Sequence, residues 1–289
     1  MPKNKKTRDE LMKKYHVLFN SFAGSGNDSY KTLSEKLDGE IVFHNVMETD
    51  YDQLFASFTQ DDVIVVCGGD GSLNKFVNRT KNIKFDNDVL YFATGTGNDF
   101  LKDLEVGKEQ TPIKINEYLK NLPVCYLNGE EHLFINGVGF GIDGYCCEEG
   151  DKLRAANVKK IDYTAIAIKG LLFKYKPTGV TVTVDGVSTH YDKTWICPVM
   201  FGRFYGGGML PCPSQTRKDD KVSVCIFHGS GKLKTLMIFP KLFKGEHIKH
   251  PKHVAVLSGR EITVEYDEPR PLQVDGETFI NVKKHTVKI

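Results

Sequence analysis

Residues Asp61–Val77 read DDVIVVCGGDGSLNKFV. The run Val63–Val66 is β-branched, does not alternate with polar residues and is bounded by charges, which predicts a strand buried on both faces. The glycine-rich stretch Gly68–Ser72 follows, and the apolar residues within Leu73–Val77 have helical spacing. A buried strand, a glycine loop and a helix start in this order present backbone N–H groups to an anion. The stretch therefore predicts an anion-binding loop, although glycines in a plain strand-to-helix turn would look the same.

The same order of elements recurs on either side of this stretch. We expect further strands and helices at the following ranges: Tyr15–Asn20, Glu40–Asn45 and Val89–Ala93 for strands, and Tyr30–Leu37 and Tyr51–Phe58 for helices. Strands that alternate with helices predict a doubly wound α/β sheet. Ligands bind such sheets beyond the carboxyl ends of the strands, where three loops would meet, at residues 21–27, 68–72 and 95–98.

From about Pro123 onward, strand-like segments dominate. They are expected at Leu133–Gly137, Gly179–Asp185, Thr194–Met200, Val222–Phe227, Val254–Leu257, Glu261–Tyr266 and Val282–Ile289, with helices at Lys160–Phe173 and Lys232–Phe243. We therefore predict two domains. Residues 1–125 would form the α/β nucleotide-binding domain, and residues 126–289 a β-rich sandwich whose last residues can pack back on the first domain.

Bulk properties narrow the class of protein. The chain has 289 residues and a net charge of +2, which is too small to indicate a nucleic-acid partner. It contains no apolar run long enough to span a membrane, and its basic start lacks the apolar stretch of a secretory signal. Seven cysteines without CxxC spacing are typical of a reducing compartment. A cytoplasmic location is the resulting expectation.

A second loop, Gly95–Phe100 (GTGNDF), strengthens the case for a ligand site. It also follows a buried strand, and it offers amides, a hydroxyl and a carboxylate together. Alternatively, Asn98 or Asp99 simply caps the next helix. Neither glycine loop has the Gly-Lys-Ser/Thr of a Walker A motif or the GxGxxG spacing of dinucleotide sites.

Together these motifs resemble the diacylglycerol kinase catalytic domain family, which includes soluble bacterial lipid kinases, sphingosine kinases and ceramide kinases. Five segments match family motifs in family order: GGDGS at Gly68–Ser72, GTGNDF at Gly95–Phe100, INGVGFGID at Ile135–Asp143, PSQTRKDDKVSV at Pro213–Val224 and VDGE at Val274–Glu277. The resemblance covers nearly the whole chain. It implies an α/β domain like those of NAD kinase and phosphofructokinase, followed by a β-sandwich domain.

The resemblance also implies transfer of the ATP γ-phosphoryl group to a lipid hydroxyl with Mg²⁺, most simply from diacylglycerol to phosphatidic acid. The implied nucleotide-binding residues are Asn20, Gly24, Ser25, Gly26, Gly68, Gly69, Asp70, Gly71, Ser72, Gly95, Thr96, Gly97, Asn98 and Asp275. Catalytic roles fall on Glu277, Asp70 and Asp143. The metal ligands would be Asp70, Asp99 and Glu277, with a second, structural metal site at Asp220.

Several of these roles stay open. Glu277 is either the general base for the lipid hydroxyl or a Mg²⁺ ligand, and Asp143 either contacts the acceptor headgroup or ends a glycine-rich turn. A second Val-Asp-Gly turn, Val184–Gly186, predicts nothing more than a hairpin. The chain also departs from the family pattern: the loop after Asn20 lacks a proline, and Lys221 stands where glycine usually follows the acidic pair, which weakens the case for metal at Asp220.

A lipid acceptor implies contact with a membrane surface. Residues Gly229–His253 carry six lysines against the single acid Glu246, interleaved with apolar residues. Such a segment fits an anionic leaflet. It also fits a helix that packs in the core with solvated lysines, and Pro240 interrupts it. A homodimer is a further possibility, but no sequence feature specifies it.

Other functions remain as alternatives. The acceptor could be a different lipid, such as a sphingoid base or phosphatidylglycerol. NAD kinase and phosphofructokinase share the GGDG loop, but the motif at Gly95–Phe100 argues against both. A non-catalytic lipid-binding regulator is disfavoured because Asp70, Asp99 and Glu277 are all present.

Overall fold

The computed structural model describes residues 13–21, 27–95, 98–158 and 161–289. The chain divides into two units, which are described separately. The first comprises Met1–Thr96 with Gly107–Lys120, and the second comprises Gly97–Val106 with Asn121–Ile289. In the described part of the chain, no helix is long and apolar enough to cross a bilayer.

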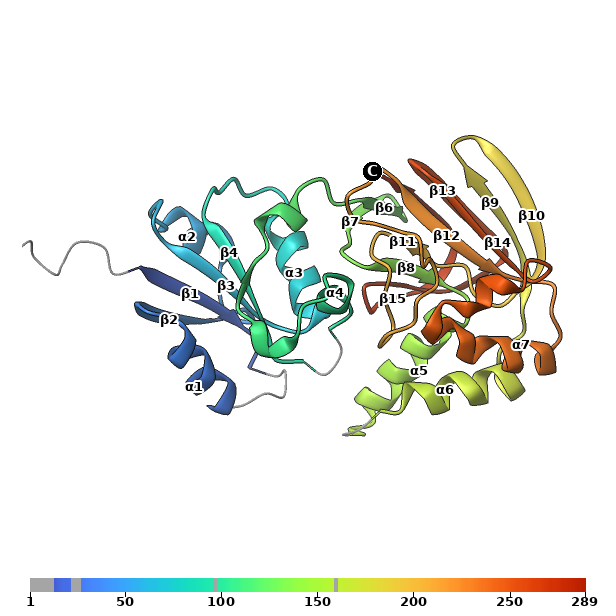
Figure 1. The fold of residues 1–289 in the computed structure, drawn as a ribbon, viewed down its shortest axis with the longest axis horizontal. Coiled ribbons are helices and arrows are strands. Elements are labelled where there is room, and N and C mark those ends of the chain that lie inside the picture. The colour runs from blue at the N-terminus through green and yellow to red at the C-terminus, as the bar shows by residue number, and fades with distance from the viewer. Residues whose placement is uncertain (1–12, 22–26, 96–97, 159–160) are drawn as a thin grey trace, which may run out of the picture. The chain divides into compact units, whose positions relative to one another are not determined.

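The first unit is built on a five-stranded sheet (Figure 1). Its strands are β1 (Lys14–Phe19), β2 (Glu40–Asn45), β3 (Val63–Gly68), β4 (Asp88–Ala93) and β5 (Ile113–Lys114), in the spatial order β2-β1-β3-β4-β5. Strands β1 to β4 are parallel, and β5 pairs antiparallel to β4. The chain runs outward from β1 to β2 and then returns to β3 on the other side of β1. This reversal between β1 and β3 is a topological switch point, where ligands of such sheets bind.

Buried apolar residues explain the arrangement of this sheet. Every residue of β3 is buried, as its unalternating sequence predicts. The helices of the unit are α1 (Asn27–Lys36), α2 (Tyr51–Ala56), α3 (Asp70–Thr80), and the short 3-10 helices η1 (Lys108–Gln110) and η2 (Asn116–Leu119). Helix α3 buries Leu73, Phe76 and Val77 on one face, which is the apolar rhythm of the opening stretch. The doubly wound α/β prediction is confirmed.

The second unit is an antiparallel β-sandwich. Its strands are β6 (Val124–Leu127), β7 (Glu130–Leu133), β8 (Gly137–Phe140), β9 (Thr178–Val184), β10 (Val187–Thr194), β11 (Val199–Met200), β12 (Val222–Phe227), β13 (Val254–Gly259), β14 (Glu261–Val274) and β15 (Glu277–Lys288). They follow the order β13-β12-β11-β8-β14-β15-β6-β7, and β9 joins β10 to β14. Each of these pairings is antiparallel. The β-rich prediction is confirmed.

Helices accompany these strands. They are α4 (Asp99–Asp103), α5 (Ile142–Ala155), α6 (Tyr163–Lys169), the π-helical η3 (Gly170–Lys174), α7 (Lys232–Ile238), and the 3-10 helices η4 (Phe239–Lys244) and η5 (Glu246–Lys249). Figure 1 shows α5, α6 and α7 on the same side of the unit. Trp195, Leu171, Ile238 and Leu242 lie in one buried cluster, so η3, α7 and η4 share a core.

The sequence patterns missed some elements. A strand expected at Leu133–Gly137 is instead the break between β7 and β8, where the Asn136 carbonyl accepts the N–H groups of Phe201 and Gly202. Helix α5 has no clear apolar rhythm, since its buried residues include Asp143, Gly144 and Gly150. A Cβ built on Gly144 would lie 1.9 Å from the Pro271 carbonyl oxygen.

Candidate active site

The glycine loop turns the chain from β3 into α3. A Cβ built on Gly68 would lie 2.1 Å from the Ser72 Oγ, so this turn requires glycine for a close internal contact. Gly71 is different, since no atom of the described residues beyond its own turn of helix lies within 4 Å of a Cβ built there. Gly69 occupies the N-cap of α3, where no described side chain forms a cap hydrogen bond. The fold explains Gly68, whereas the space above Gly71 is open to a ligand.

A surface depression lies at the switch point of the first unit. Its lining comes from the ends of β1 and β3, from α3 and from the segment after β2: Leu18, Phe19, Asn20, Val46, Met47, Tyr51, Val66, Cys67, Ser72, Lys75, Phe76 and Arg79. Asn20 and Ser72 were predicted, but Lys75 and Arg79 were missed. Lys75 and Arg79 follow Ser72 by three and seven residues. This helical spacing places all three residues on the same face of α3, and it is the sequence signal that could have identified them.

Arg79 is held in place at this depression. Its Nη1 donates to the Val46 carbonyl at 2.5 Å, and its guanidinium lies 5.3 Å from the centre of the Tyr51 ring. Together with the exposed Lys75, it brings positive charge to the loop. Such charge favours the anionic ligand that the helix N-terminus also attracts.

The second glycine loop starts beside the first. The Thr94 N–H donates to the Gly68 carbonyl at 3.0 Å, and the Lys108 Nζ donates to the carbonyls of Thr94 and Gly95 at 3.1 and 3.0 Å. Thr96 and Gly97 lie outside the described residues. Gly24, Ser25 and Gly26, which follow Asn20 in the sequence, also lie outside them. Asn98 precedes α4 as its N-cap.

Asp99 begins α4 in the second unit and is buried. Its Oδ2 accepts the Gly207 N–H at 2.8 Å. Gly206, Gly207 and Gly208 all have positive φ, a conformation that suits glycine, and the amides of Gly207 and Gly208 donate to this carboxylate. Burial raises the pKa of Asp99, and the hydrogen bonds from Gly207 and Gly208 oppose that rise. The glycine run was not singled out from the sequence, because nothing local links it to Asp99.

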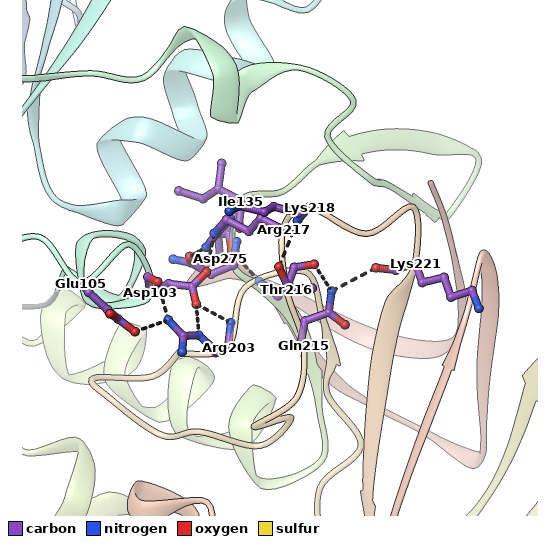
Figure 2. Close-up of polar contacts among 12 residues, drawn as sticks. Asp103, Glu105, Ile135, Arg203, Gln215, Thr216, Arg217, Lys218, Lys221 and Asp275 are labelled. Carbon is purple, nitrogen blue, oxygen red and sulfur yellow. Dashed lines mark hydrogen bonds and ion pairs between the residues drawn. The ribbon is translucent and has the colours of Figure 1, made fainter.

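Asp103, at the end of α4, forms two ion pairs (Figure 2). Arg203 Nε donates to Asp103 Oδ1 at 2.8 Å, and Arg217 Nε donates to Oδ2 at 2.5 Å. The side chains of Asp103 and Arg217 are almost fully buried, at 4% and 6% exposed. A buried carboxylate of this kind needs its paired charges, because removing one partner leaves a charge without compensation.

Arg217 continues the network toward the start of β8. Its Nη2 donates to Asn136 Oδ1 at 2.7 Å, and its Nη1 donates to the Ile135 carbonyl. The Asp275 carboxylate binds the same segment from the other side, accepting N–H groups of Ile135, Asn136 and Gly137 at 2.5, 2.9 and 2.9 Å (Figure 2). Three of the five motifs, at Ile135–Asp143, Pro213–Val224 and Val274–Glu277, therefore meet in one hydrogen-bonded network within the second unit, which Asp103 of α4 joins through Arg217.

The network fixes the turn that carries Glu277. Asp275 and Gly276 have φ of 45° and 89° and join Val274 to Glu277 as a two-residue hairpin turn. Glu277 itself is exposed at the start of β15. The Glu277 carboxylate is thus exposed beside a turn in which the Asp275 carboxylate accepts three backbone N–H groups.

The other Val-Asp-Gly turn provides a comparison. Asp185 and Gly186 have φ of 46° and 85° and join β9 to β10, so the hairpin prediction is confirmed. The Asp185 carboxylate accepts the N–H groups of Arg260 and Glu261, both at 2.9 Å. The two turns have similar backbone φ angles. What distinguishes the turn at Asp275 is its link, through Ile135–Gly137, to the hydrogen-bonded network around Arg217.

Asp143 lies in the first turn of α5 and is buried. Its Oδ2 accepts the Tyr205 hydroxyl at 2.5 Å. Burial raises the pKa of Asp143 to about 7, and the bond from Tyr205 opposes that rise. The residue is therefore a buried partner of Tyr205 rather than the end of an exposed turn.

We expect Asp143 to make stability fall with rising pH. Its pKa in the folded chain, about 7, lies above the ordinary 3.8, so the folded state holds the proton more tightly. This contribution is complete below the ordinary pKa and is lost as pH rises through about 7. Relative to Asp143→Asn, the native chain should lose up to about 4 kcal/mol of unfolding free energy between about pH 4 and about pH 8. Urea unfolding of both proteins across this range measures it, and parallel pH profiles would contradict it.

The predicted metal ligands are distributed over both units. Asp220 is exposed and pairs with Arg260, whose Nη1 lies 2.8 Å from its Oδ2, so an arginine supplies the charge compensation there. Asp70 belongs to the first unit, and Asp99, Asp220 and Glu277 belong to the second. Among the described residues, no group of three or more His, Cys, Asp or Glu is arranged to hold a metal ion.

Fold and site together define a two-domain kinase, with an α/β domain that carries the glycine loop and a β-sandwich that carries the turn at Asp275–Glu277. Residues 14–123 match the diacylglycerol kinase catalytic domain, and residues 136–286 match the YegS C-terminal NAD kinase beta sandwich-like domain. The chain belongs to the diacylglycerol kinase catalytic domain family and is a lipid kinase. The resemblance read from the motifs is confirmed.

Proteins similar to this chain come from several bacteria. The chain is 23% identical over 244 residues to a diacylglycerol kinase of Bacillus subtilis, covering 80% of this chain and 78% of the relative. A diacylglycerol kinase of Mycobacterium tuberculosis is 23% identical over 195 residues, covering 65% and 62%. The crystal structure of a diacylglycerol kinase from Bacillus anthracis superposes with a TM-score of 0.66 at 21% identity, covering 96% and 95% of the two chains. That structure shares the fold.

Proposed function

We propose that the chain transfers the γ-phosphoryl group of ATP to the hydroxyl of diacylglycerol, which yields phosphatidic acid. The observation that carries this proposal is the glycine loop at the switch point of the first unit, with open space at Gly71. Family membership supports a lipid acceptor. Two relatives named diacylglycerol kinase favour diacylglycerol over other lipids.

The first unit would supply most of the nucleotide contacts, and Gly97 and Asn98 at the start of the second unit would add to them. Backbone amides of Gly68–Ser72 and the N-terminus of α3 would hold the phosphates, with Lys75 and Arg79 adding positive charge. Phosphoryl transfer depends mainly on such positioning and charge neutralisation. Asn20, Gly95 and Asn98 complete the proposed contacts, together with Gly24, Ser25, Gly26, Thr96 and Gly97.

Magnesium fits part of the predicted ligand set. Mg²⁺ usually binds one or two carboxylates together with substrate phosphates and water, and when bound it would neutralise phosphate charge. Asp70, in the first turn of α3, and the exposed Glu277 offer such carboxylates. Asp99 fits less well, since it is buried and its Oδ2 accepts the Gly207 N–H.

The second unit would act on the acceptor. The exposed Glu277 would take the proton from the lipid hydroxyl, as a general base does. Asp275 would position it, because its bonds to Ile135–Gly137 fix the turn. In this proposal Asp143 and Tyr205 lie beside the acceptor headgroup.

We expect Gly71→Val to abolish ATP binding without unfolding the chain. The new side chain enters space that the described residues leave open, so it would obstruct phosphate at the loop. The free energy of unfolding should change by about 0.5 kcal/mol or less, as for other exposed positions. Isothermal titration with MgATP measures the loss. The matched variant Gly68→Ala should instead destabilise the fold, and normal ATP binding by folded Gly71→Val would move the nucleotide away from this loop.

The proposed acceptor is tested by product identification. The purified chain is incubated with MgATP and a total lipid extract, and new phosphorylated lipids are identified by mass spectrometry. We expect phosphatidic acid to form with the native chain and not with Glu277→Gln. A phosphorylated sphingoid base or phosphatidylglycerol as the main product would replace the acceptor, and phosphorylation of only soluble compounds would contradict the lipid assignment.

A further inference from the structure

Four large apolar side chains are exposed on neighbouring elements of the second unit. Ile168 lies on α6, Phe173 on η3, and Leu233 and Met237 on α7, with exposures of 45%, 75%, 79% and 67%. We call the surface formed by these residues and the lysines of α6, η3, α7 and the adjoining η4 the α6–α7 face. Exposed apolar residues gathered in this way mark an interaction site more often than scattered single ones do.

The two halves of this face are in direct contact. The Lys232 Nζ at the start of α7 donates to the Leu172 carbonyl of η3 at 2.7 Å. Phe173 and Leu233 each follow one of these two residues in sequence. Figure 1 shows α6 and α7 along the same side of the unit. Leu233 and Met237 are four residues apart on α7 and therefore share a helix face.

The core does not require these exposed side chains. Leu171, Ile238 and Leu242 fill the buried side of the same elements. The predicted basic segment Gly229–His253 thus contains a helix that packs in the core, which is one of the two interpretations considered for it. Helix α7 ends at Ile238, before Pro240, and the segment packs one side in the core while Leu233 and Met237 remain exposed.

The face is strongly positive. Residues 163–174 and 232–244 contain six lysines and no acidic residue: Lys169, Lys174, Lys232, Lys234, Lys241 and Lys244. Lys174 also lines a depression of about 360 Å³ with Lys176 and Arg270, where Glu268 is the single acid. The surface beside Phe173 is therefore suited to phosphate groups.

The combination of lysines and exposed apolar side chains indicates which kind of partner can bind the α6–α7 face. In a two-fold dimer the same patch meets itself, so lysines would oppose lysines at a cost in free energy. An anionic bilayer instead offers phosphates to the lysines, at about 1 kcal/mol for each. It also offers an apolar interior to Phe173, Leu233 and Met237.

We propose that the α6–α7 face docks the chain on an anionic lipid bilayer, with Phe173, Leu233 and Met237 inserted at headgroup level. The inference rests on the proposed function only in that the acceptor of a lipid kinase lies in a bilayer. It names the surface that meets the bilayer, which the substrate alone does not specify.

Vesicle co-sedimentation without nucleotide tests the apolar part of the face. Vesicles contain phosphatidylcholine alone or with about one third phosphatidylglycerol. The double variant Phe173→Ser/Leu233→Ser should bind the anionic vesicles at least about tenfold more weakly than the native chain. The control is Val187→Ser/Ile280→Ser, which removes apolar side chains of similar exposure, 73% and 67%, from β10 and β15. It should bind as the native chain does.

A second pair of variants tests the charge. Lys174→Gln/Lys234→Gln should weaken binding roughly tenfold or more, and added salt should weaken binding of the native chain. Lys283→Gln/Lys284→Gln, on β15, removes the same charge away from the face and should have little effect. All four lysines are exposed, so each variant should remain folded.

Several outcomes would overturn the docking proposal. One is that the native chain binds both kinds of vesicle equally, and another is that it binds neither. A third is that the face variants and their control variants lose the same amount of vesicle affinity. If Phe173→Ser/Leu233→Ser kept its vesicle binding but changed the sedimentation coefficient from dimer to monomer, the face would belong to a second copy. Binding is measured without ATP, so it can succeed even if diacylglycerol is not the acceptor. Unchanged activity of that variant on a short-chain diacylglycerol in solution would confirm that the face acts through the bilayer.

Discussion

Replacing Glu277 with glutamine is expected to lower kcat by about 100-fold or more, the usual contribution of a general base. The substitution keeps the size of the side chain and removes only its ability to take a proton. Because Glu277 is exposed, the free energy of unfolding should stay within about 0.5 kcal/mol of the native value. Affinity for MgATP should not change. Steady-state kinetics and nucleotide titration together measure the effect.

The same variant distinguishes the two roles considered for Glu277. A Mg²⁺ ligand would, when lost, weaken MgATP binding and raise the Mg²⁺ concentration needed for activity, whereas a base would affect kcat alone. Glu261→Gln is the matched control, since it removes an exposed carboxylate from the paired strand β14, where Glu261 contacts Lys288 at 3.0 Å. An unchanged kcat in Glu277→Gln would exclude the residue from catalysis.

Replacing Arg217 with methionine should destabilise the second unit by about 3–5 kcal/mol, the cost of breaking a buried ion pair. The substitution leaves the buried Asp103 carboxylate with Arg203 as its remaining ion-pair partner in the described residues. It also removes the donor to Asn136 Oδ1 and to the Ile135 carbonyl. Urea unfolding at neutral pH measures the loss.

Arg260→Met provides the control for Arg217. Arg260 also pairs with an aspartate, Asp220, but both side chains are more than half exposed, at 63% and 68%. Exposed pairs of this kind contribute about 1 kcal/mol or less. If both substitutions had the same small effect, the Arg217 network would not be a stabilising element. A double-mutant cycle with Asp103→Asn would give the coupling energy between the two side chains.

The fold of the first unit could be predicted because its signals are local. The unalternating run of β3 and the glycines after it specify a buried strand and a turn, and the strand order then follows from alternating elements. Helix α5 could not be predicted in this way. Its contacts depend on Gly144 meeting the backbone near Pro271, and the sequence gives no sign of an approach between residues so far apart.

The site was predictable to a similar extent. Motif order identified the segments containing Asp99, Asp275 and Glu277, because each of them carries several unusual residues together. The partners of these segments were missed. Arg203, Tyr205 and the glycines of residues 206–208 are ordinary in sequence, and their contacts with Asp103, Asp143 and Asp99 span 62 to 108 residues. These residues come into contact only in the folded chain.

The assignment of α4 to the second unit bears on how the protein can be dissected. The family match to the catalytic domain runs to residue 123, which would suggest expressing the N-terminal portion by itself. That fragment would carry Asp103 without Arg203 and Arg217, and Asp99 without Gly207. The chain passes between the units after residues 96, 106 and 120, so no single cut separates them. A self-contained N-terminal fragment would have to omit residues 97–106 and join the flanking segments directly.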